Sequence, residues 1–310
     1  MASSSETADN IAKGCGLESV GCAYRLPLTG WVSQNERGTL SIMKEFLLDK
    51  PSEESVMLDI QTMFEIYPSN ETGTIPLGIR INDAVYASQI AGVDTVTGEV
   101  ESDDLRTQMT MALAHVKTLV ERAGGTLDNV GRCVGYVTNI EARKPVYKPW
   151  DELFPNPADR PAFKALVTTL PPGHLVHLDV LALLGERRTR IDIQNVPARD
   201  PSIHIGNWFF TSRCHGHDPA TGMIVDGGLA AETLQILNNI VHLTELAGGQ
   251  ESDITQVTMF GRDDSYFAEA KLVFEKRFPD RGTRPTLHQV VTFVTLTFQI
   301  SIEGTAYLSD

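Results

Sequence analysis

The chain has 310 residues, 42% of them hydrophobic and 21% charged, which is typical of a folded protein of about two domains. Its net charge of −14 disfavours nucleic acid as a partner, because phosphate binding requires concentrated Lys and Arg side chains. No run of residues approaches the ~18 apolar positions of a membrane helix, and the N-terminus lacks the apolar segment of a secretion signal. We therefore expect a cytoplasmic protein with neither nucleic acid nor a membrane as partner, whose four cysteines (Cys15, Cys22, Cys133 and Cys214) are reduced thiols.

The sequence contains an internal repeat with a constant shift of 124 positions. The pattern D-x-x-T-G at 94–98 recurs at 218–222, and no gap is needed along about 110 positions of the comparison. The same shift relates Gly124-Gly125 to Gly248-Gly249 and Arg160-Pro161 to Arg284-Pro285. We interpret the chain as an N-terminal extension of unknown role (1–70), a first module (71–190) and a second module (191–310).

Each copy predicts the same succession of elements. A β-hairpin is indicated at 79–92 and again at 203–216 by alternating or aromatic apolar residues around N-D and G-N turn pairs. A long helix follows in each copy, with apolar residues three and four positions apart, and ends at Gly-Gly. A strand, a second helix and two closing strands come next, at 130–140, 142–154, 162–169 and 175–184 in the first copy and at 254–264, 266–278 and 286–304 in the second. The order ββαβαββ predicts an α+β fold in which two helices cover one face of a four- to five-stranded sheet.

Several segments of the first copy resemble the Rid (YjgF-like) family. They are YASQIAGVDTVTGE, ERAGGTLDNV, CVGYVTNI, RPA and LPPGHLVHLDVLAL, in the order and spacing of that family. The second copy keeps FFTSRCHGHDPATG, LAGGQESDITQV and RP. The resemblance implies chorismate-mutase-like modules that assemble as trimers, with sites in clefts between modules. It also implies hydrolysis of reactive enamines and imines with release of ammonia and no cofactor.

The residues that carry the family's chemistry differ in both copies. In the family, the last Arg of the R-P-A-R motif grips a substrate carboxylate. Counted from the Arg-Pro pair, this position holds Phe163 in the first copy and Leu287 in the second. Counted back from the closing strand, it holds Ala162 or Thr286. The Glu that holds water corresponds to His177 and Ser301. The Gly of the family's S-G-Q turn corresponds to Gln89 and Arg213, and a cleft Asn to Glu141 and Ser265. The resemblance therefore predicts the fold and the cleft, but not the standard deaminase residues.

The segment Cys214–Asp218 is the main candidate for chemistry, because it follows the hairpin of the second copy beside the turn that binds substrate in the family. His215 or His217 can act as a general acid or base near neutral pH. A metal site and a plain polar loop are the alternatives, and we expect no bound metal. The candidate catalytic residues are His215, His217, His177 and Glu141. The candidate substrate-binding residues are Ser88, Gln89, Ser212, Arg213, Cys214, Asp218, Ser265, Arg284, His288 and Glu303.

Some of these residues also have a structural interpretation. Arg284, like its counterpart Arg160, can stabilise a turn, and Glu303 can form hydrogen bonds within the sheet. Arg213 can supply the cation that the lost family Arg no longer provides, or lie on the surface.

Three functions are compatible with the pattern. The first is a cofactor-independent enzyme that acts on an imine, enamine or related carbonyl compound, since no Gly-rich nucleotide-binding motif occurs. The second is a diverged biosynthetic enzyme that cyclises, isomerises or eliminates in a small-molecule pathway. The third is a non-catalytic ligand-binding or interaction protein. In each case we expect a small-molecule ligand and a homo-oligomer with trimer-like packing of modules, because the family's sites form between modules.

Overall fold

The computed structural model describes residues 76–309, apart from 199, 293, 295 and 296, together with four short strands that precede them. These strands are β1 (Tyr24–Leu26), β2 (Gly30–Gln34), β3 (Leu40–Ile42) and β4 (Met63–Ile66). The chain divides into two compact units, Met1–Asp59 and Ile60–Asp310. In the first unit β1, β2 and β3 form an antiparallel sheet. Most of the extension, including Cys15 and Cys22, lies outside the described residues.

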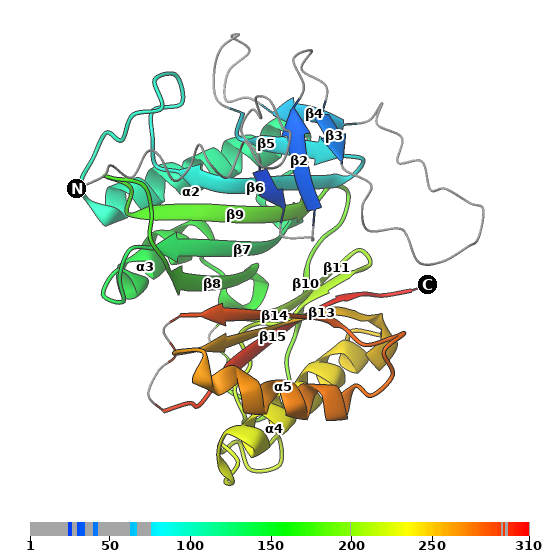
Figure 1. The fold of residues 1–310 in the computed structure, drawn as a ribbon. Coiled ribbons are helices and arrows are strands. Elements are labelled where there is room, and N and C mark those ends of the chain that lie inside the picture. The colour runs from blue at the N-terminus through cyan, green and yellow to red at the C-terminus, as the bar shows by residue number, and fades with distance from the viewer. Residues whose placement is uncertain are drawn as a thin grey trace, which may run out of the picture. The chain divides into compact units, whose positions relative to one another are not determined.

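The second unit contains two modules with the same succession of elements (Figure 1). The first module comprises β4, β5 (Gly78–Ile81), β6 (Ala84–Ala91), α2 (Leu105–Arg122), β7 (Val130–Val137), α3 (Arg143–Leu153), β8 (Ala162–Val167) and β9 (Val176–Leu183). The second comprises β10 (Thr189–Ile191), β11 (Ser202–Ile205), β12 (Trp208–Phe210), α4 (Gly228–Leu246), β13 (Ile254–Gly261), α5 (Ser265–Arg277), β14 (Thr286–Val291) and β15 (Ser301–Tyr307). From β5 and from β11 onward the order is ββαβαββ, which confirms the predicted α+β modules.

The two sheets have the same strand order, with one strand more than expected. They run β4-β5-β6-β9-β7-β8 and β10-β11-β12-β15-β13-β14. The pairs β7–β8 and β13–β14 are parallel and the other pairs are antiparallel. The additional strand in each sheet is the edge strand, β4 or β10, which is only three or four residues long and too short for a clear alternating pattern.

Helix boundaries follow from local signals in the sequence. Helix α2 begins after Asp104, whose carboxylate accepts a hydrogen bond from the backbone N–H of Thr107 at 2.8 Å. It ends where Gly124 adopts a φ of 92°, and α4 ends in the same way at Gly248, with a φ of 95°. The Gly-Gly pairs of the repeat are thus the helix stops that the sequence predicted.

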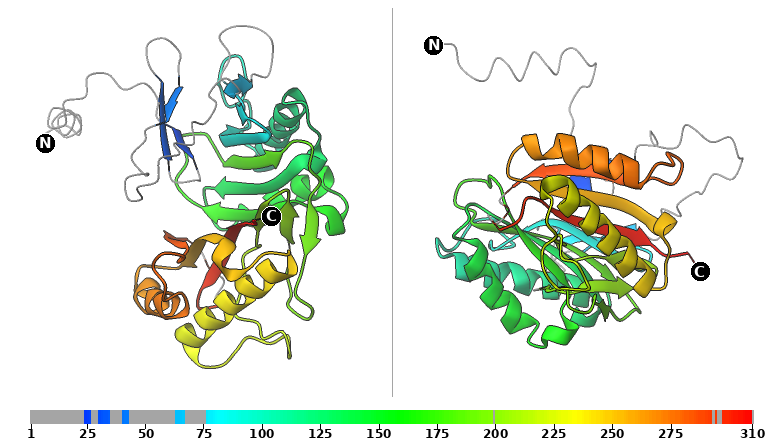
Figure 2. Two further views of the ribbon diagram at one scale, coloured as in Figure 1. Left: turned by 90° about the vertical axis from the view of Figure 1, so that its right-hand side faces the viewer. Right: turned by 90° about the horizontal axis from the view of Figure 1, so that it is seen from below.

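Each sheet buries one face under its own helices and the other face against the second sheet. The first helix-covered core includes Met109, Val116 and Trp150, and its counterpart in the second module includes Ile236 and Phe274. Two smaller clusters join the sheets of the two modules: one contains Leu181, Ile203, Ile205 and Phe210, and the other contains Val134, Leu166 and Phe260. Seen from below, the helices of the two modules lie on opposite outer sides with the sheets between them (Figure 2).

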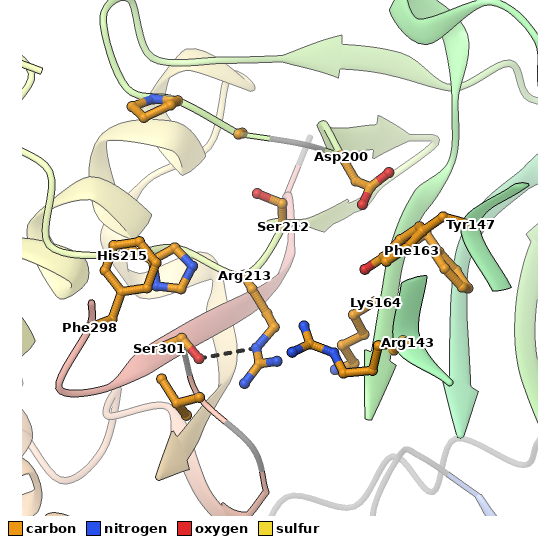
Figure 3. A pocket seen from close by; sticks show the side chains of 14 residues that line it. Arg143, Tyr147, Phe163, Lys164, Asp200, Ser212, Arg213, His215, Phe298 and Ser301 are labelled. Carbon is orange, nitrogen blue, oxygen red and sulfur yellow. Dashed lines mark hydrogen bonds between the residues drawn. The ribbon is translucent and has the colours of Figure 1, made fainter. Parts of the chain in front are cut away.

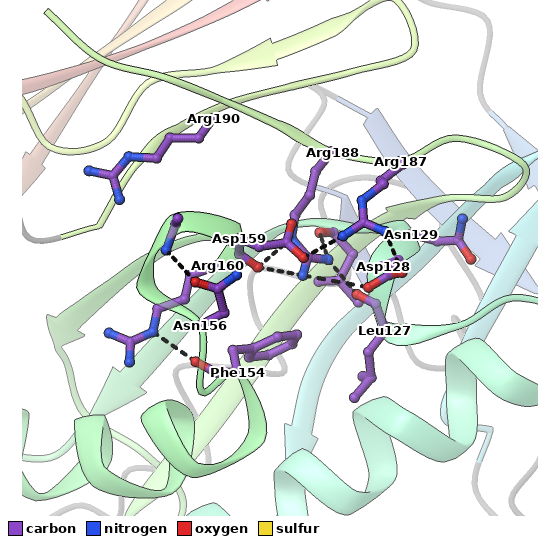
Figure 4. A network of polar contacts seen from close by, with 12 residues as sticks. Leu127, Asp128, Asn129, Phe154, Asn156, Asp159, Arg160, Arg187, Arg188 and Arg190 are labelled. Atoms are coloured by element: carbon purple, nitrogen blue, oxygen red, sulfur yellow. Dashed lines mark hydrogen bonds and ion pairs between the residues drawn. The ribbon is translucent and has the colours of Figure 1, made fainter.

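A buried arginine fixes the segment that joins the modules (Figure 4). The guanidinium of Arg188 donates to the backbone oxygens of Leu127 and Asp159, each at 2.6 Å, and lies 5.5 Å from the ring centre of Phe154. Its side chain is only 3% exposed. These bonds attach the start of the second module to two turns of the first and so help to set the position of one sheet on the other.

Within the described residues, no helix is long and apolar enough to span a membrane.

Candidate active site between the modules

A pocket of about 190 Å³ opens where α3 and β8 of the first module meet the second module (Figure 3). Both modules contribute side chains to its wall. Its polar lining consists of Arg143, Tyr147 and Lys164 from the first module and Asp200, Ser212, Arg213, His215 and Ser301 from the second. Apolar side chains, chiefly Phe163, Val294 and Phe298, complete the wall. The pocket is therefore small, mixed in polarity and rich in cations.

Strand alternation directs Lys164 to the space between the sheets. Its neighbours on β8, Phe163 and Ala165, belong to the helix-covered core, and the ring of Phe163 stacks on Trp150 at 4.3 Å. Because successive side chains of a strand point to opposite faces, Lys164 must point to the other face. There its side chain is 9% exposed, and its ammonium nitrogen lies 4.9 Å from the ring centre of Phe260 in the second module.

Lys164 shares a carboxylate with a second cation. Its Nζ contacts Oε1 of Glu303 on β15, and Nη2 of Arg132 on β7 donates to the same oxygen at 3.0 Å. Burial lowers the pKa of Lys164 to about 7, although the attraction of Glu303 opposes this shift. Burial acts to raise the pKa of Glu303, but Lys164 and Arg132 together keep it below its ordinary value. Near neutral pH the pair thus holds an ionised carboxylate beside an amine that readily exchanges its proton.

Arg213 enters the pocket because its backbone neighbour is anchored to β15. Cys214 and Ile302 exchange two backbone hydrogen bonds, of 2.8 and 3.1 Å, so the residues on either side of Cys214 point the same way. The Nε of Arg213 donates to Oγ of Ser301 at 3.0 Å, and its guanidinium lies 4.6 Å from the ring centre of Phe260. Burial lowers the pKa of Arg213 to about 10, so the guanidinium stays charged at neutral pH.

Two arginines and the amine of Lys164 thus line one small space, together with one carboxylate, Asp200. Arg143 lies close enough to lower the pKa of Arg213 further, and Figure 3 shows both side chains near Lys164. Like charges in a partly buried site repel one another, and a bound anion relieves that repulsion. Guanidinium groups in particular match the geometry of a carboxylate. The arrangement is suited to holding a small carboxylate.

The two candidate histidines of the second module occupy different environments. The ring of His215 lines the pocket and stacks on Phe298, with ring centres 3.7 Å apart and planes 12° apart. Burial lowers its pKa to about 3, so the imidazole is neutral, and its buried Nδ1 has no hydrogen-bond partner among the described residues. His217 is buried beside the pocket but not among its lining residues, and burial lowers its pKa as well.

The rest of the Cys214–Asp218 segment shapes the loop. Burial raises the pKa of Cys214 to about 12, so it remains a thiol, and Sγ lies 3.4 Å from the backbone oxygen of Ser212. Asp218 closes a turn by accepting from the backbone N–H of Ala220 at 2.9 Å. No group of His, Cys, Asp and Glu side chains within the described ranges is arranged to hold a metal ion.

The candidates of the first module lie outside this pocket. His177 is buried next to His174, with Nε2 and Nδ1 2.8 Å apart, and burial lowers the pKa of His177 to about 4. Gln89 adopts a φ of 60° on β6, and its backbone N–H donates to Asp179 at 2.9 Å. Ser88 precedes it on the same strand, and Glu141 is exposed.

The remaining candidates of the second module are also separate from the pocket. Ser265 starts α5 and donates to Asp263. The Nε of Arg284 donates to the backbone oxygen of Phe278 at 2.6 Å, in the same way as Arg160 donates to that of Phe154 at 2.8 Å (Figure 4). His288 lies on β14. Of the candidates from the sequence, Ser212, Arg213 and His215 line the pocket, and Glu303 lies behind it as the partner of Lys164.

Sequence reasoning overlooked three cations of this site. Lys164 stands alone among apolar residues in AFKALV, and Arg132 stands alone in VGRCVGYV. A single charge within a buried strand needs a partner, so these positions carried a detectable signal. Arg143, the first residue of α3, gave none, because a charged residue at a helix start is ordinary.

The fold defines a class: two tandem chorismate-mutase-like modules, with a small pocket between unlike halves. The sequence model of the family described as Endoribonuclease L-PSP matches residues 75–184 and 198–308, and the chain belongs to this family, which is also known as YjgF/RidA. This membership confirms the resemblance noted in the sequence.

Relatives match one module each. The RutC family protein PH0854 of Pyrococcus horikoshii is 33% identical over 107 residues, which are 34% of this chain and 83% of that protein. The chain spans 61% of the RutC family protein PYRAB12510 of Pyrococcus abyssi, at 32% identity over a quarter of its own length. A protein of Escherichia coli named 2-iminobutanoate/2-iminopropanoate deaminase is 29% identical over 33% of this chain and 78% of its own length. A solved structure, a putative endoribonuclease L-PSP from Entamoeba histolytica, is 25% identical over 39% of this chain and 99% of its own, with a TM-score of 0.35.

Proposed function

We propose that this protein is an enzyme that deaminates a small imine or enamine carrying a carboxylate, in the pocket between its two modules. The observation that carries the proposal is the convergence of Arg143, Arg213 and Lys164 on one pocket of about 190 Å³. Drug-sized ligands occupy sites of ~300–1,000 Å³, so this pocket suits a substrate of only a few heavy atoms. The relative named as a 2-iminobutanoate/2-iminopropanoate deaminase acts, by its name, on molecules of this size and charge.

In this proposal the two arginines replace the carboxylate clamp that the family motif has lost. Ala162 and Thr286 occupy the family position when it is counted from the closing strand. Arg213 instead reaches the pocket from the second module, and Arg143 from the first. Holding the carboxylate between two modules places the reacting carbon beside Lys164.

Lys164 and His215 divide the proton chemistry. A group with a pKa near the working pH is the most effective general acid or base, and the pKa of Lys164 is about 7. Neutral His215 is too weak a base to abstract a proton readily, but its ring lines the pocket, where an imidazole nitrogen can exchange a hydrogen bond with the attacking water. In this assignment the paired Lys164 and Glu303 move the protons and His215 positions the water.

The test is turnover of 2-iminopropanoate generated enzymatically in the cuvette, with loss of the imine followed over time. We expect the protein to accelerate imine loss well above the buffer rate and the Arg213→Met variant to lose most of that acceleration. Arg106→Met is the matched control, because Arg106 lies on the exposed surface of α2 and pairs with Glu152. Absence of acceleration by the wild-type protein refutes the deaminase proposal. Saturable binding of a small carboxylate without turnover would favour a binding protein instead.

We also propose that the protein assembles with further copies of itself through β14, an edge strand of its second sheet. Strand β8 is almost entirely buried, whereas its counterpart β14 is largely exposed or half-buried. Val291 is 52% exposed, although its counterpart in the first module, Val167, packs against the helix-covered core. A module of another copy that covered β14 as the second module covers β8 would bury this surface.

A further inference from the structure

We propose that Lys164 is a covalent nucleophile, which forms an imine between its Nζ and the electrophilic carbon of the substrate. This inference rests on the proposed function, because the pocket must first bind the substrate carboxylate. Among the described residues that line the pocket, Lys164 is the one that carries a primary amine. Its Nζ is therefore the atom of the pocket lining that can replace the substrate nitrogen in the C=N bond.

The position of Lys164 suits a nucleophile that must be held still. It lies in the middle of β8, where the parallel pairing with β7 aligns it with Val134. Its side chain is packed beneath the ring of Phe260 and is almost completely removed from solvent. A site that excludes bulk water protects an imine between the enzyme and the substrate until the leaving amine has departed.

The groups around Lys164 supply what amine activation requires. A lysine reacts only as the neutral amine, and burial near other cations favours that form. Burial lowers the pKa of Lys164 to about 7, Arg132 and Arg213 also act to lower it, and Glu303 opposes the shift, so much of the amine is neutral at physiological pH. Glu303, which contacts Nζ directly, is an ionised carboxylate that can accept the proton of the ammonium and return it later.

The reaction balances without any oxidant, reductant or further reactant except water. Glu303 takes a proton from Nζ, the amine lone pair forms a bond to the imine carbon, and the C=N π electrons move to the substrate nitrogen, which takes up a proton. Nζ then gives one of its two protons to the same nitrogen, the bond from carbon to that nitrogen breaks with release of ammonia, and the carbon becomes doubly bonded to Nζ. Water adds to this new imine, and the resulting carbinolamine collapses to a 2-oxo acid and free Lys164. The net change is imine plus water to ketone plus ammonia.

The second copy offers no equivalent nucleophile. The counterpart of Lys164 is His288, whose imidazole cannot form a stable imine with a carbonyl carbon. The counterpart of Glu303 is Asp179, which bonds to Tyr136 and to the backbone of Gln89 instead of to an amine. The covalent step is therefore assigned to a single position of the chain.

The experiment is reductive trapping with pyruvate, the 2-oxo acid that corresponds to 2-iminopropanoate. The full chain is incubated with pyruvate and sodium borohydride, and its intact mass and peptide masses are measured. We expect one reduced pyruvyl adduct, on the peptide that contains Lys164, together with irreversible loss of imine turnover. Borohydride alone should give neither, and the Lys117→Met variant, changed at an exposed lysine of α2, should be trapped like the wild type.

Two further measurements separate this inference from the proposed function. Lys164→Arg keeps a cation beside Glu303, so it should fold and bind pyruvate while forming no adduct and losing turnover at least about a hundredfold. Pyruvate binding is followed separately by line broadening of its methyl signal. Binding and turnover without an adduct, or wild-type turnover by Lys164→Arg, would overturn the covalent step and leave the deaminase proposal standing. Absence of both binding and turnover in the wild type would overturn both.

Discussion

The carboxylate of Glu303 should contribute more to stability than any other acidic side chain between the two sheets. It is 6% exposed and faces two cations, Lys164 and Arg132. Replacing Glu303 by Gln keeps the shape but leaves both cations without their anion, and removing one member of a buried ion pair costs about 3–5 kcal/mol. Because Lys164 already has a pKa of about 7, it can lose its proton at little cost. The loss should then fall near the lower end, about 3 kcal/mol.

Asp179→Asn is the matched control, since Asp179 occupies the corresponding position of the first module. Its carboxylate accepts from Tyr136 at 2.9 Å and from the backbone N–H of Gln89 at 2.9 Å, and both are neutral donors. An Asn oxygen can still accept one of these bonds, so the change should cost only about 1 kcal/mol. Urea unfolding at pH 7, followed by tryptophan fluorescence, measures both variants. Equal destabilisation by Glu303→Gln and Asp179→Asn would refute the assignment of Glu303 as the anion that two buried cations share.

Three further predictions concern activity and assembly. Arg213→Met should lower kcat/KM for 2-iminopropanoate by about 10- to 100-fold, mainly through KM, because it removes a charge-assisted hydrogen bond to the carboxylate; an unchanged KM would contradict the clamp. The wild-type kcat/KM should rise with pH up to about 7 and then level off, because Lys164 loses its proton in this range. The residual kcat/KM of Lys164→Arg should not show this rise. Val291→Glu should shift the protein to a smaller species in size-exclusion chromatography with light scattering, since it places a charge at an exposed position of the edge strand β14. An unchanged mass would exclude this strand as the interface.

Most of the fold was accessible from the sequence, because the repeat and the local signals agree. The Gly-Gly pairs end α2 and α4 as expected, and the ββαβαββ order appears in both modules. The edge strands β4 and β10 were not predicted, because three or four residues are too few to establish an alternating pattern. Edge strands of this kind depend on pairing with a neighbour more than on their own residues.

The site was only partly accessible, because it depends on contacts between distant parts of the chain. The sequence singled out Arg213 and His215 from their place beside the turn, and both line the pocket. It could not pair Lys164 with Glu303, which lie 139 positions apart and meet only when one sheet packs on the other. The resemblance to the family also directed attention to His177, which occupies the position of the family's Glu in the first copy, although its counterpart Ser301 is the one that lines this pocket.

The divergence of the two copies explains why the ion-pair network of Lys164, Arg132 and Glu303 is not repeated at the corresponding positions of the other copy. Shifted by 124 positions, Lys164 becomes His288 and Arg132 becomes Gln256, so neither cation of the ion-pair network has an equivalent. The acidic counterpart of Glu303, Asp179, accepts from Tyr136 and the backbone of Gln89 instead. The two cations come from the first module and the anion from the second, so the network forms only where the two sheets pack on each other. Divergence after duplication allows this arrangement, because each half can carry the charges that the other half neutralises.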